Sequence, residues 1–308
     1  MAEISANWRN LCLTDVRKWF SDTLLDFESM IPQLYTTGTS TREEEYDMTY
    51  SGLGNFKLLN GSATRDTMTE EYKTTYSFPE WTQSIDIRRK LYDDRRDRTV
   101  MNMAAEMGLS YNRTKEAHAA EPFNFAFTAT GTYSSGDTTA LADAKALCAN
   151  DHPSKASGTY AGDNLGTGAM AASTVSTMRD QMRDITDGRG NKSYLSLDTL
   201  LVPADKDIEE VAWEIINTAG KVDVTDNNRN FHKGRYGLAV WMELTNHKNW
   251  FGLDSKHLKM YLNWFNRVKL ETWNTFDEDS QTLTFGGYER HGFGIPSWRF
   301  VVGNQVTT

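Results

Sequence analysis

Residues 166–171 are the part of the sequence that comes nearest to a nucleotide-binding motif. Gly166, Gly168 and Ala171 match a GxGxxA fingerprint where a helix is expected to begin. That fingerprint needs a hydrophobic strand running directly into the glycines, so that the helix N-terminus faces a pyrophosphate. The preceding residues, SGTYAGDNL, are typical of a loop, and no GxxxxGK[ST] phosphate loop occurs. We therefore expect no dinucleotide or other cofactor.

Metal-binding patterns are incomplete as well. The segment 223–228, DVTDNN, resembles the start of a calcium loop, but that loop needs glycine at its sixth position and glutamate at its twelfth. This chain has Asn228 and Gly234 there, so a turn rich in Asp and Asn is expected. No HxH or HExxH pattern joins the six histidines, which are His118, His152, His232, His247, His257 and His291. We therefore predict no metal site.

Nucleophile motifs are absent from the sequence. There is no GxSxG elbow, and the two cysteines, Cys12 and Cys148, lie among apolar residues with no CxxC pattern. We expect both thiols to pack as small hydrophobic groups. The carboxylates are numerous but scattered, so no acid–base pair can be assigned. The search predicts no catalytic residue, and we expect that the protein is not an enzyme.

Composition points to a folded, acidic protein. The 308 residues carry a net charge of -9, which disfavours a general phosphate-binding surface. Nine tryptophans and thirteen tyrosines argue against disorder. The first residues, MAEISANWRN, lack the basic and apolar regions of a signal peptide, and no run approaches the ~20 apolar residues of a membrane span. We expect a soluble intracellular protein.

The stretch 76–107 organises the rest of the chain. After Ile87 the pattern becomes helical, and a helix is predicted over 88–120, ending before Pro122. Charges at helical spacing predict three ion pairs, which are Arg89 with Asp93, Lys90 with Asp94 and Asp94 with Arg98. The alternative is a surface helix whose charges simply face water.

Residues 46–87 precede this helix and predict a hairpin. Asn60-Gly61 is a turn signal, and the flanking segments contain few large aliphatic residues. Such a hairpin buries little core by itself, so it must lie on another surface, in the same chain or on a neighbouring copy. We expect a variant lacking residues 50–80 to fold but to lose any assembly that depends on the hairpin.

Other segments complete a mixed α+β prediction. An amphipathic helix is expected at 14–29, followed by a polar linker. Alternation of Phe123, Phe125 and Phe127 predicts a strand. Helices are expected after Ser173 and Asp205, which would cap them, and end near Gly188 and Gly220. Further strands are expected at 194–202, 236–244, 260–273, 281–285 and 300–302.

Short motifs in one order resemble the major capsid proteins of tailed phages, in particular the Mu-type major head subunits of the Hong Kong 97 fold. Those motifs are Lys73-Thr74-Thr75-Tyr76, Ile87-Arg88-Arg89, Asp93-Asp94, Ala146-Leu147-Cys148, His152-Pro153, Gly162-Asp163-Asn164-Leu165, Leu200-Leu201-Val202-Pro203, Ala212, Lys233-Gly234, Trp250-Phe251-Gly252-Leu253 and Arg299-Phe300-Val301-Val302-Gly303. The likeness covers the chain from about residue 46 onward.

The resemblance implies an architecture of four parts. Residues 1–45 would be an N-terminal arm and 46–87 an extended loop over a neighbouring subunit. Residues 88–154 and 286–308 would form a peripheral domain with a spine helix, and 155–285 an α/β axial domain. Contacts between subunits would involve residues of the loop and of the helix start, which are Tyr50, Phe56, Lys57, Leu58, Tyr72, Tyr76, Arg88, Arg89, Asp93 and Asp94.

The resemblance also implies a function. The chain would assemble as hexamers and pentamers into an icosahedral shell around phage DNA, inside a bacterial cytoplasm, and would become part of the virion. Its partners would be other copies of itself, a scaffolding protein, a portal and a decoration protein, with no membrane. Two alternatives are an encapsulin-like compartment and a soluble α+β enzyme. Crosslinking through Lys57 or Lys73 is left open.

Overall fold

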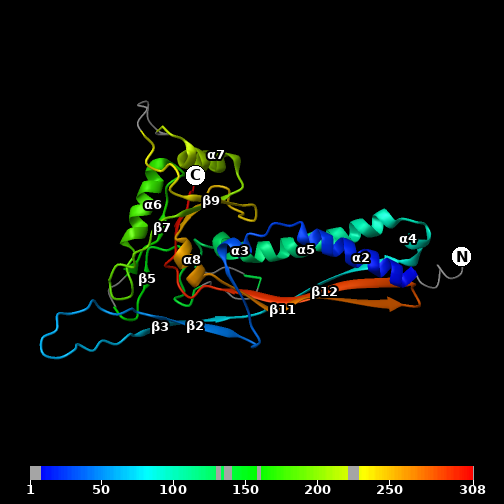
Figure 1. Cartoon of the computed structure of the whole chain (residues 1–308), viewed down its shortest axis with the longest axis horizontal. Coiled ribbons are helices and arrows are strands. Elements are labelled where there is room, and N and C mark those ends of the chain that lie inside the picture. The colour runs from blue at the N-terminus through cyan, green and yellow to red at the C-terminus, as the bar shows by residue number, and fades with distance from the viewer. Residues whose placement is uncertain (1–7, 130–132, 135–140, 158–160, 221–228, 308) are drawn as a thin grey trace.

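The structure is a computed structural model, and it describes residues 8–129, 133–134, 141–157, 161–220 and 229–307. Within these ranges the chain forms a long spine unit, a five-stranded unit and a projecting hairpin (Figure 1). Helices and strands both contribute, which confirms the expected α+β class. None of the helices in these ranges is long and apolar enough to cross a membrane.

The spine unit is a four-stranded sheet with two helices along it. Its strands lie in the order β1 (Thr36–Thr39), β11 (Asn263–Asp277), β12 (Thr282–Gly294), β4 (Glu80–Arg88). β1 runs parallel to β11, and the other neighbours are antiparallel. The helices α2 (Trp8–Leu25) and α5 (Asp97–Asn124) extend beside the long β11–β12 hairpin (Figure 1).

Burial of one stripe holds α2 in place. Its buried residues recur every four positions and therefore share a face, and they are Trp8, Cys12, Val16 and Phe20. This stripe packs against Met107 of α5 and against Ile87 and Phe285 of the sheet. The helix predicted at 14–29 is confirmed, although it begins at Trp8 and ends at Leu25.

The single helix predicted over 88–120 is wrong at its start. A short helix, α4 (Arg89–Asp93), ends at a turn in which Arg95 has φ 50°, and α5 begins only at Asp97. The ion pair between Arg89 Nε and Asp93 Oδ2 forms at 3.3 Å inside α4. The turn interrupts the other two predicted pairs, and neither is among the ion pairs of the described residues.

The predicted end of this helix is also wrong, because α5 continues through Pro122 to Asn124. Proline removes one backbone hydrogen bond there. Burial of Phe123 against Phe251, with ring centroids 5.3 Å apart, offsets that loss. The strand predicted from Phe123, Phe125 and Phe127 is therefore wrong, since these residues form the helix end and the turn after it.

The five-stranded unit is built around a mixed sheet. Its strands lie in the order β7 (Leu165–Gly166), β13 (Val301–Asn304), β10 (Trp250–Leu253), β8 (Thr199–Pro203), β9 (Gly237–Trp241). The parallel pair β8–β9 is joined through α7 (Lys206–Asn217), and α6 (Ala172–Asp184) covers the sheet with the buried stripe Val175, Met178 and Met182. These elements contribute to the larger of the two hydrophobic cores found within the described ranges.

Helix caps in this unit only partly match the prediction. The Asp205 side chain accepts a hydrogen bond from the Asp207 backbone N–H at 3.0 Å, which confirms it as the cap of α7. The cap of α6 is Ala171 rather than Ser173. The strand predicted at 260–273 begins only at Asn263, because Asp254 caps a helix, α8 (Ser255–Tyr261), that extends into the predicted range before β11 begins.

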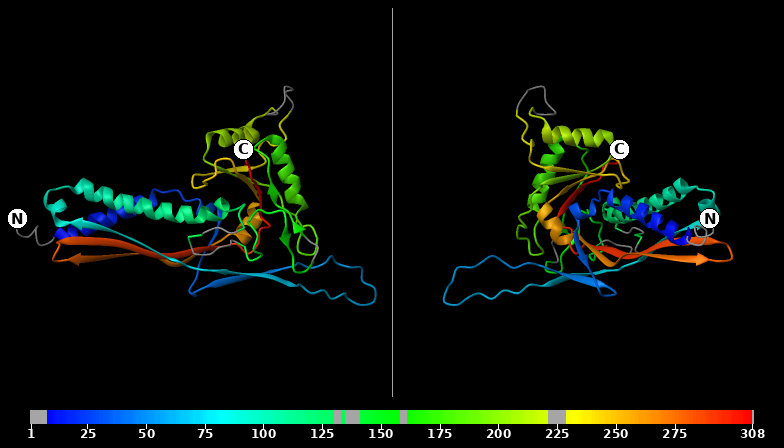
Figure 2. Two further views of the ribbon diagram at one scale, coloured as in Figure 1. Left: turned by 180° about the vertical axis from the view of Figure 1, so that it is seen from behind. Right: turned by 45° about the vertical axis from the view of Figure 1, so that its right-hand side comes forward.

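The hairpin consists of β2 (Glu45–Tyr50) and β3 (Glu70–Tyr76), paired in antiparallel register. The loop between them, residues 51–69, extends beyond the other elements in all three views (Figures 1 and 2). Gly61 has φ 85° and lies in a tight bridge between Asn60 and Ser62, as the Asn-Gly signal predicts. The strands are shorter than expected.

Minor elements connect the three parts. They are α3 (Ile31–Leu34), β5 (His152–Pro153) and β6 (Ala161–Gly162). Two of the expected boundaries fall inside continuous strands, one between residues 87 and 88 in β4 and one between 285 and 286 in β12. β11 pairs with β12 along most of its length, so its residues 263–277 are structurally part of the spine unit.

Candidate assembly surfaces

The tip of the hairpin exposes large apolar side chains. Phe56 is 107% exposed, Leu58 95% and Leu59 72%. Isolated exposed apolar residues are ordinary, but three within four positions place an unusual amount of apolar surface on a projecting loop. Leu53 and Met68, nearer the base of the loop, are exposed as well. A surface of this kind marks a contact with another molecule.

The base of the same loop is fastened to the five-stranded unit. Arg189 Nη1 donates to both oxygens of Asp66, at 2.9 and 2.8 Å, and Asn191 Nδ2 donates to the Leu53 carbonyl at 3.2 Å. The hydrogen bond from Arg189 and the backbone N–H groups of Gly54 and Thr67 lower the pKa of Asp66 to about 2. The loop is therefore held at its base and free at its apolar tip.

The strands of the hairpin make further contacts within the chain. Glu71 is buried and accepts a hydrogen bond from Ser154 Oγ at 2.6 Å. Tyr76 is buried as well. Its hydroxyl donates to Asp47 Oδ2, and its ring stacks on Phe265 with centroids 5.7 Å apart. Burial, followed by the hydrogen bond to Asp47, raises the pKa of Tyr76.

The predicted assembly residues of the hairpin therefore divide into two groups. Phe56, Lys57 and Leu58 are exposed in the loop, and Tyr50 is 51% exposed at the end of β2. Tyr72 is half-buried, with Lys155 Nζ 4.5 Å from its ring centroid. The Tyr76 side chain, in contrast, is buried within its own chain.

The other predicted residues lie together at the far end of the spine. Arg89 is braced internally, since its backbone N–H donates to the Gln281 carbonyl at 3.0 Å and its Nη1 to Gln281 Oε1 at 3.3 Å. With its partner Asp93, it ties α4 to the β11–β12 turn. Arg88 and Asp94 are exposed beside this pair. The structure thus separates these four residues from the hairpin.

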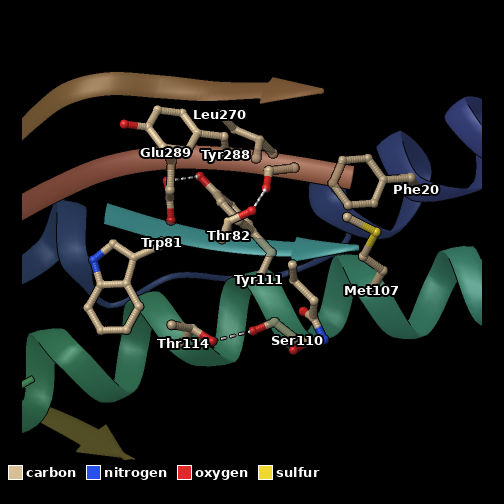
Figure 3. A pocket seen from close by; sticks show the side chains of 12 residues that line it. Phe20, Trp81, Thr82, Met107, Ser110, Tyr111, Thr114, Leu270, Tyr288 and Glu289 are labelled. Carbon is tan, nitrogen blue, oxygen red and sulfur yellow. Dashed lines mark hydrogen bonds between the residues drawn. The ribbon is translucent and has the colours of Figure 1, made fainter. Parts of the chain in front are cut away.

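A cavity of about 360 Å³ lies between α5 and the sheet of the spine (Figure 3). Tyr111 Oη donates to Glu289 Oε2 at 2.8 Å across its wall, and Phe20, Met107 and Leu270 supply apolar surface. Burial, followed by the charge of Glu289, raises the pKa of Tyr111, which makes its hydroxyl a poor acid at neutral pH. This hydroxyl–carboxylate pair forms part of the cavity wall.

Two histidines that are distant in sequence meet beneath the spine helix. His118 of α5 and His291 of β12 have ring centroids 5.1 Å apart and are fully buried among aromatic rings. Burial lowers the pKa of His118 to about 3 and lowers the pKa of His291. No group of three potential metal ligands occurs among the described residues. The pair is therefore a neutral part of the packing.

The remaining sequence patterns have structural explanations where they are described. Gly168 N donates to Asn304 Oδ1 at 3.0 Å, and a side chain at Gly166 would collide with the same atom at 2.3 Å. The glycines of the fingerprint thus allow close packing against β13. Cys12 and Cys148 are buried free thiols, as expected. The calcium-like segment 223–228 lies outside the described residues.

Sequence reasoning missed several residues of the hairpin surface. Leu59 belongs to the apolar tip, and its position next to Leu58 and Asn60-Gly61 was a usable signal. The pairing of Asp66 with Arg189 spans 123 positions, and no local pattern announces it. Only the fold shows that Phe56 is exposed whereas Tyr76 is buried.

Comparisons with known proteins agree with this architecture. The model of a family described as phage capsid protein matches residues 71–304. Among solved structures, the capsid of a native GTA particle is 12% identical, with 92% of each chain covered and a TM-score of 0.57. The capsid of the Myoviridae phage XM1 is 8% identical, covering 91% of this chain and 92% of that one, with a TM-score of 0.54.

A virus-like particle from Pyrococcus furiosus has the same fold, at 10% identity and a TM-score of 0.51, covering 94% of this chain and 97% of that one. At such identities these likenesses show the fold alone, and they confirm the expected Hong Kong 97-type fold. No curated protein sequence matches this chain.

Proposed function

Because this chain belongs to the phage capsid protein family, we propose that its hairpin is the principal contact between neighbouring subunits. The protein is a major capsid protein, the structural subunit of an icosahedral shell, and assembles with copies of itself. We propose further that the copies form hexamers and pentamers. The observation that carries the proposal is the exposed apolar tip at Phe56, Leu58 and Leu59.

The hairpin suits an intersubunit contact for physical reasons. Its tip exposes apolar side chains to water, which burial on a neighbouring copy would relieve at roughly 25 cal/mol per Å². Its base is held by Arg189 and Asn191, so less conformational freedom is lost on contact. Many identical contacts of modest strength then add up over a closed shell.

The three parts of the fold correspond to proposed assembly roles. We assign the hairpin loop to contacts over a neighbour, the spine unit to the peripheral domain and the five-stranded unit to the axial domain around capsomer centres. In this division β11 and all of β4 and β12 belong to the peripheral domain, because they form one sheet. Residues 8–34 pack along that domain as an arm.

Specific residues keep their proposed roles according to their exposure. Tyr50, Phe56, Lys57, Leu58 and Tyr72 remain candidates for contacts with a neighbour. Arg88 and Asp94 remain candidates at the far end of the spine, where Arg89 and Asp93 support them by bracing α4.

The remaining partners follow from charge and from capsid biology. We propose that the shell encloses double-stranded DNA without specific binding, because a net charge of -9 repels phosphate. A scaffolding protein, a portal and a decoration protein complete the proposed set. Assembly is proposed in the cytoplasm of the host bacterium, and the family places the finished product in the virion.

The two alternatives are less well supported. An encapsulin-like compartment shares the fold, but the family that matches this sequence is one of phage capsid proteins. A soluble enzyme would need a site, and the spine cavity offers only a hydrogen-bonded Tyr111 and Glu289. A structural protein accounts for both the family match and the composition of this cavity.

The test is to change the tip without disturbing the fold. A variant with Phe56→Ser, Leu58→Ser and Leu59→Ser should remain folded, because all three side chains are exposed. Co-expressed with its genomic neighbours, it should fail to form the shells that the wild-type chain forms in negative-stain electron microscopy. Met260→Ser on α8, which removes another exposed apolar side chain, is the control. Normal shells from the triple variant would overturn the proposal.

Excision of residues 50–80 is not a suitable test of this contact. It would remove the buried Tyr76 and Phe78, together with Glu71 and the first residue of β4. Such a variant would therefore lose buried residues together with the loop. Substitution at the tip avoids this loss of core.

A further inference from the structure

The five-stranded unit exposes a cationic patch in which two arginines share one aromatic ring. Arg179 Cζ lies 4.6 Å from the centroid of Phe231, and Arg235 Cζ lies 4.0 Å from it. Phe231 is 49% exposed, and Lys233 is exposed beside it. A guanidinium that contacts a ring keeps its N–H edges for carboxylates. We call Arg179, Arg183, Phe231, Lys233 and Arg235 the cationic patch.

Contacts within the chain fix the patch in place. His232 is buried between Ser176 Oγ and Tyr236 Oη, each 3.1 Å from one ring nitrogen, and this fastens the 231–236 segment to α6. Arg235 Nε donates to the Phe231 carbonyl at 2.6 Å. Asp180 neutralises only part of the charge, at 3.7 Å from Arg179 and 3.8 Å from Arg183. The patch is thus preorganised and positive on an acidic protein.

A face of opposite charge lies on α7. Between Lys206 and Asn217 this helix carries one lysine and four acidic residues. Trp213 is 58% exposed, and Glu209, Glu210 and Glu214 are exposed around it at helical spacing. None of these three glutamates is in an ion pair within the described ranges of the chain. We call Asp207, Glu209, Glu210, Trp213 and Glu214 the acidic face.

The cationic patch lies on α6 and on the segment 231–236, and the acidic face lies on the exposed side of α7. The segment joins the end of α7 through the Gly234 N–H and the Ile216 carbonyl, 2.8 Å apart. α6 runs along one side of the unit, whereas α7 lies across its end (Figure 1). No ion pair joins them among the described residues. A subunit with complementary charges on two separate surfaces is suited to a ring, in which each copy presents one surface to the copy before it and the other to the copy after it.

We infer that the acidic face of α7 docks on the cationic patch of the next copy and closes the capsomer ring. The occupant is a second copy of this chain, with Glu210 and Glu214 facing the guanidinium groups and Trp213 covering the exposed Phe231. The inference rests on the proposed function, since it assumes that the chains form rings. It adds which two surfaces pair, and therefore the direction in which one copy follows the next around the ring.

The test reverses the charges on one surface at a time. One variant carries Lys233→Glu and Arg235→Glu, and another carries Glu210→Lys and Glu214→Lys; all four side chains are exposed, so each variant should fold. Each should lose shells in electron microscopy under conditions where the wild-type chain forms them. The variant that combines all four substitutions should regain them, because both surfaces then have reversed charge.

Mixing the two double variants gives a sharper outcome. In a mixed ring, a cationic patch of reversed charge meets an acidic face of reversed charge only if the two variants alternate around the ring. Alternation closes a hexamer but not a pentamer, so co-expression should give flat sheets or tubes and no closed shells. The control is Lys256→Glu with Lys269→Glu, which changes net charge equally at exposed positions outside the patch and should leave shells intact.

The outcomes separate this inference from the function on which it rests. If the wild-type chain forms no shells with its genomic neighbours, the capsid proposal fails. If wild-type shells form and the double variants assemble equally well, only the inference fails. The inference also fails if both double variants fold and form no shells, and the variant with all four substitutions forms none either. Direct pairing of the two surfaces requires that the fourfold variant regain shells.

Discussion

His152 Nε2 lies 3.2 Å from Asn164 Oδ1, and this contact links two motifs that are separate in the sequence. The same oxygen accepts the Ala149 N–H at 2.8 Å. Asn164 Nδ2 donates to the carbonyls of Leu147, at 2.9 Å, and Val301, at 3.0 Å. Four of the ordered motifs, those at 146–148, 152–153, 162–165 and 299–303, therefore meet at one buried amide, which gives them a shared structural role.

Asn164→Asp tests this buried network. The change keeps the shape but replaces an amide donor with an oxygen facing two carbonyls, and it buries a charge at a fully buried position. Each buried polar group left without a partner costs about 1–3 kcal/mol. We expect a loss of at least about 2 kcal/mol in the free energy of unfolding by chemical denaturation. Asn217→Asp, at an exposed position, is the control; equal effects would show that the network contributes little.

Local patterns predicted those parts of the fold that local forces determine. The four-residue spacing of Val16 and Phe20 predicts a helix face whatever it packs against, and Asn60-Gly61 predicts a turn from its own backbone preference. The break at Arg95 and the continuation through Pro122 were missed. Both depend on distant contacts, of α4 with Gln281 and of Phe123 with Phe251. Propensity alone carries no information about those partners.

The sequence could indicate the hairpin as an assembly surface, because its segments contain few large aliphatic residues, but not which of its side chains are exposed. Phe56, Leu58 and Tyr76 were all named as contact residues from the capsid resemblance, and Phe56 and Leu58 are exposed. Tyr76 is buried, since Phe265 and Asp47 enclose it. Its ring partner is far away in sequence. Whether a side chain at the end of a strand is exposed depends on such partners, which come from distant parts of the sequence.

Gly292→Ala tests the packing between β12 and the end of the hairpin. A Cβ at this position would lie 2.3 Å from the Ser77 carbonyl oxygen, and a backbone atom cannot move aside as a flexible side chain can. Overpacking of this kind costs about 1–3 kcal/mol. The melting temperature should therefore fall. Gly237→Ala, whose Cβ would meet no atom closer than 3.7 Å, is the matched control and should change it little.

Arg189→Ala tests the fastening of the hairpin loop. The substitution removes the hydrogen bonds to Asp66 and to the Thr67 carbonyl, so the segment 51–69 should be cleaved faster in limited proteolysis of the unassembled subunit. The overall melting temperature should hardly change, because the pair lies at the surface. Lys192→Ala, which breaks a separate exposed pair with Asp184, should leave cleavage of the loop unchanged. Equal cleavage rates in both variants would show that Arg189 does not hold the loop.

Lowering the pH should destabilise the spine unit through the buried His118. Its pKa is lowered to about 3 by burial and by His291, whereas in the unfolded chain it returns to about 6.5. The unfolded state then binds more protons, so this contribution to stability is complete above about pH 6.5 and is lost as the pH falls toward 3. Between pH 7.5 and 5 the expected loss from this group is about 2 kcal/mol.

His118→Phe isolates that contribution. Glu121 lies 3.9 Å from His118 Nε2, and Glu289 and Lys115 face His291, and all three groups are present in both proteins. Neither ring nitrogen of His118 has a hydrogen-bond partner in the described structure, so phenylalanine removes the titration without removing such a bond. The variant should lose less stability between pH 7.5 and 5 than the wild-type chain, whereas His247→Gln, at an exposed position, should not. An unchanged pH dependence in His118→Phe would show that the histidine is not forced to stay neutral by its burial.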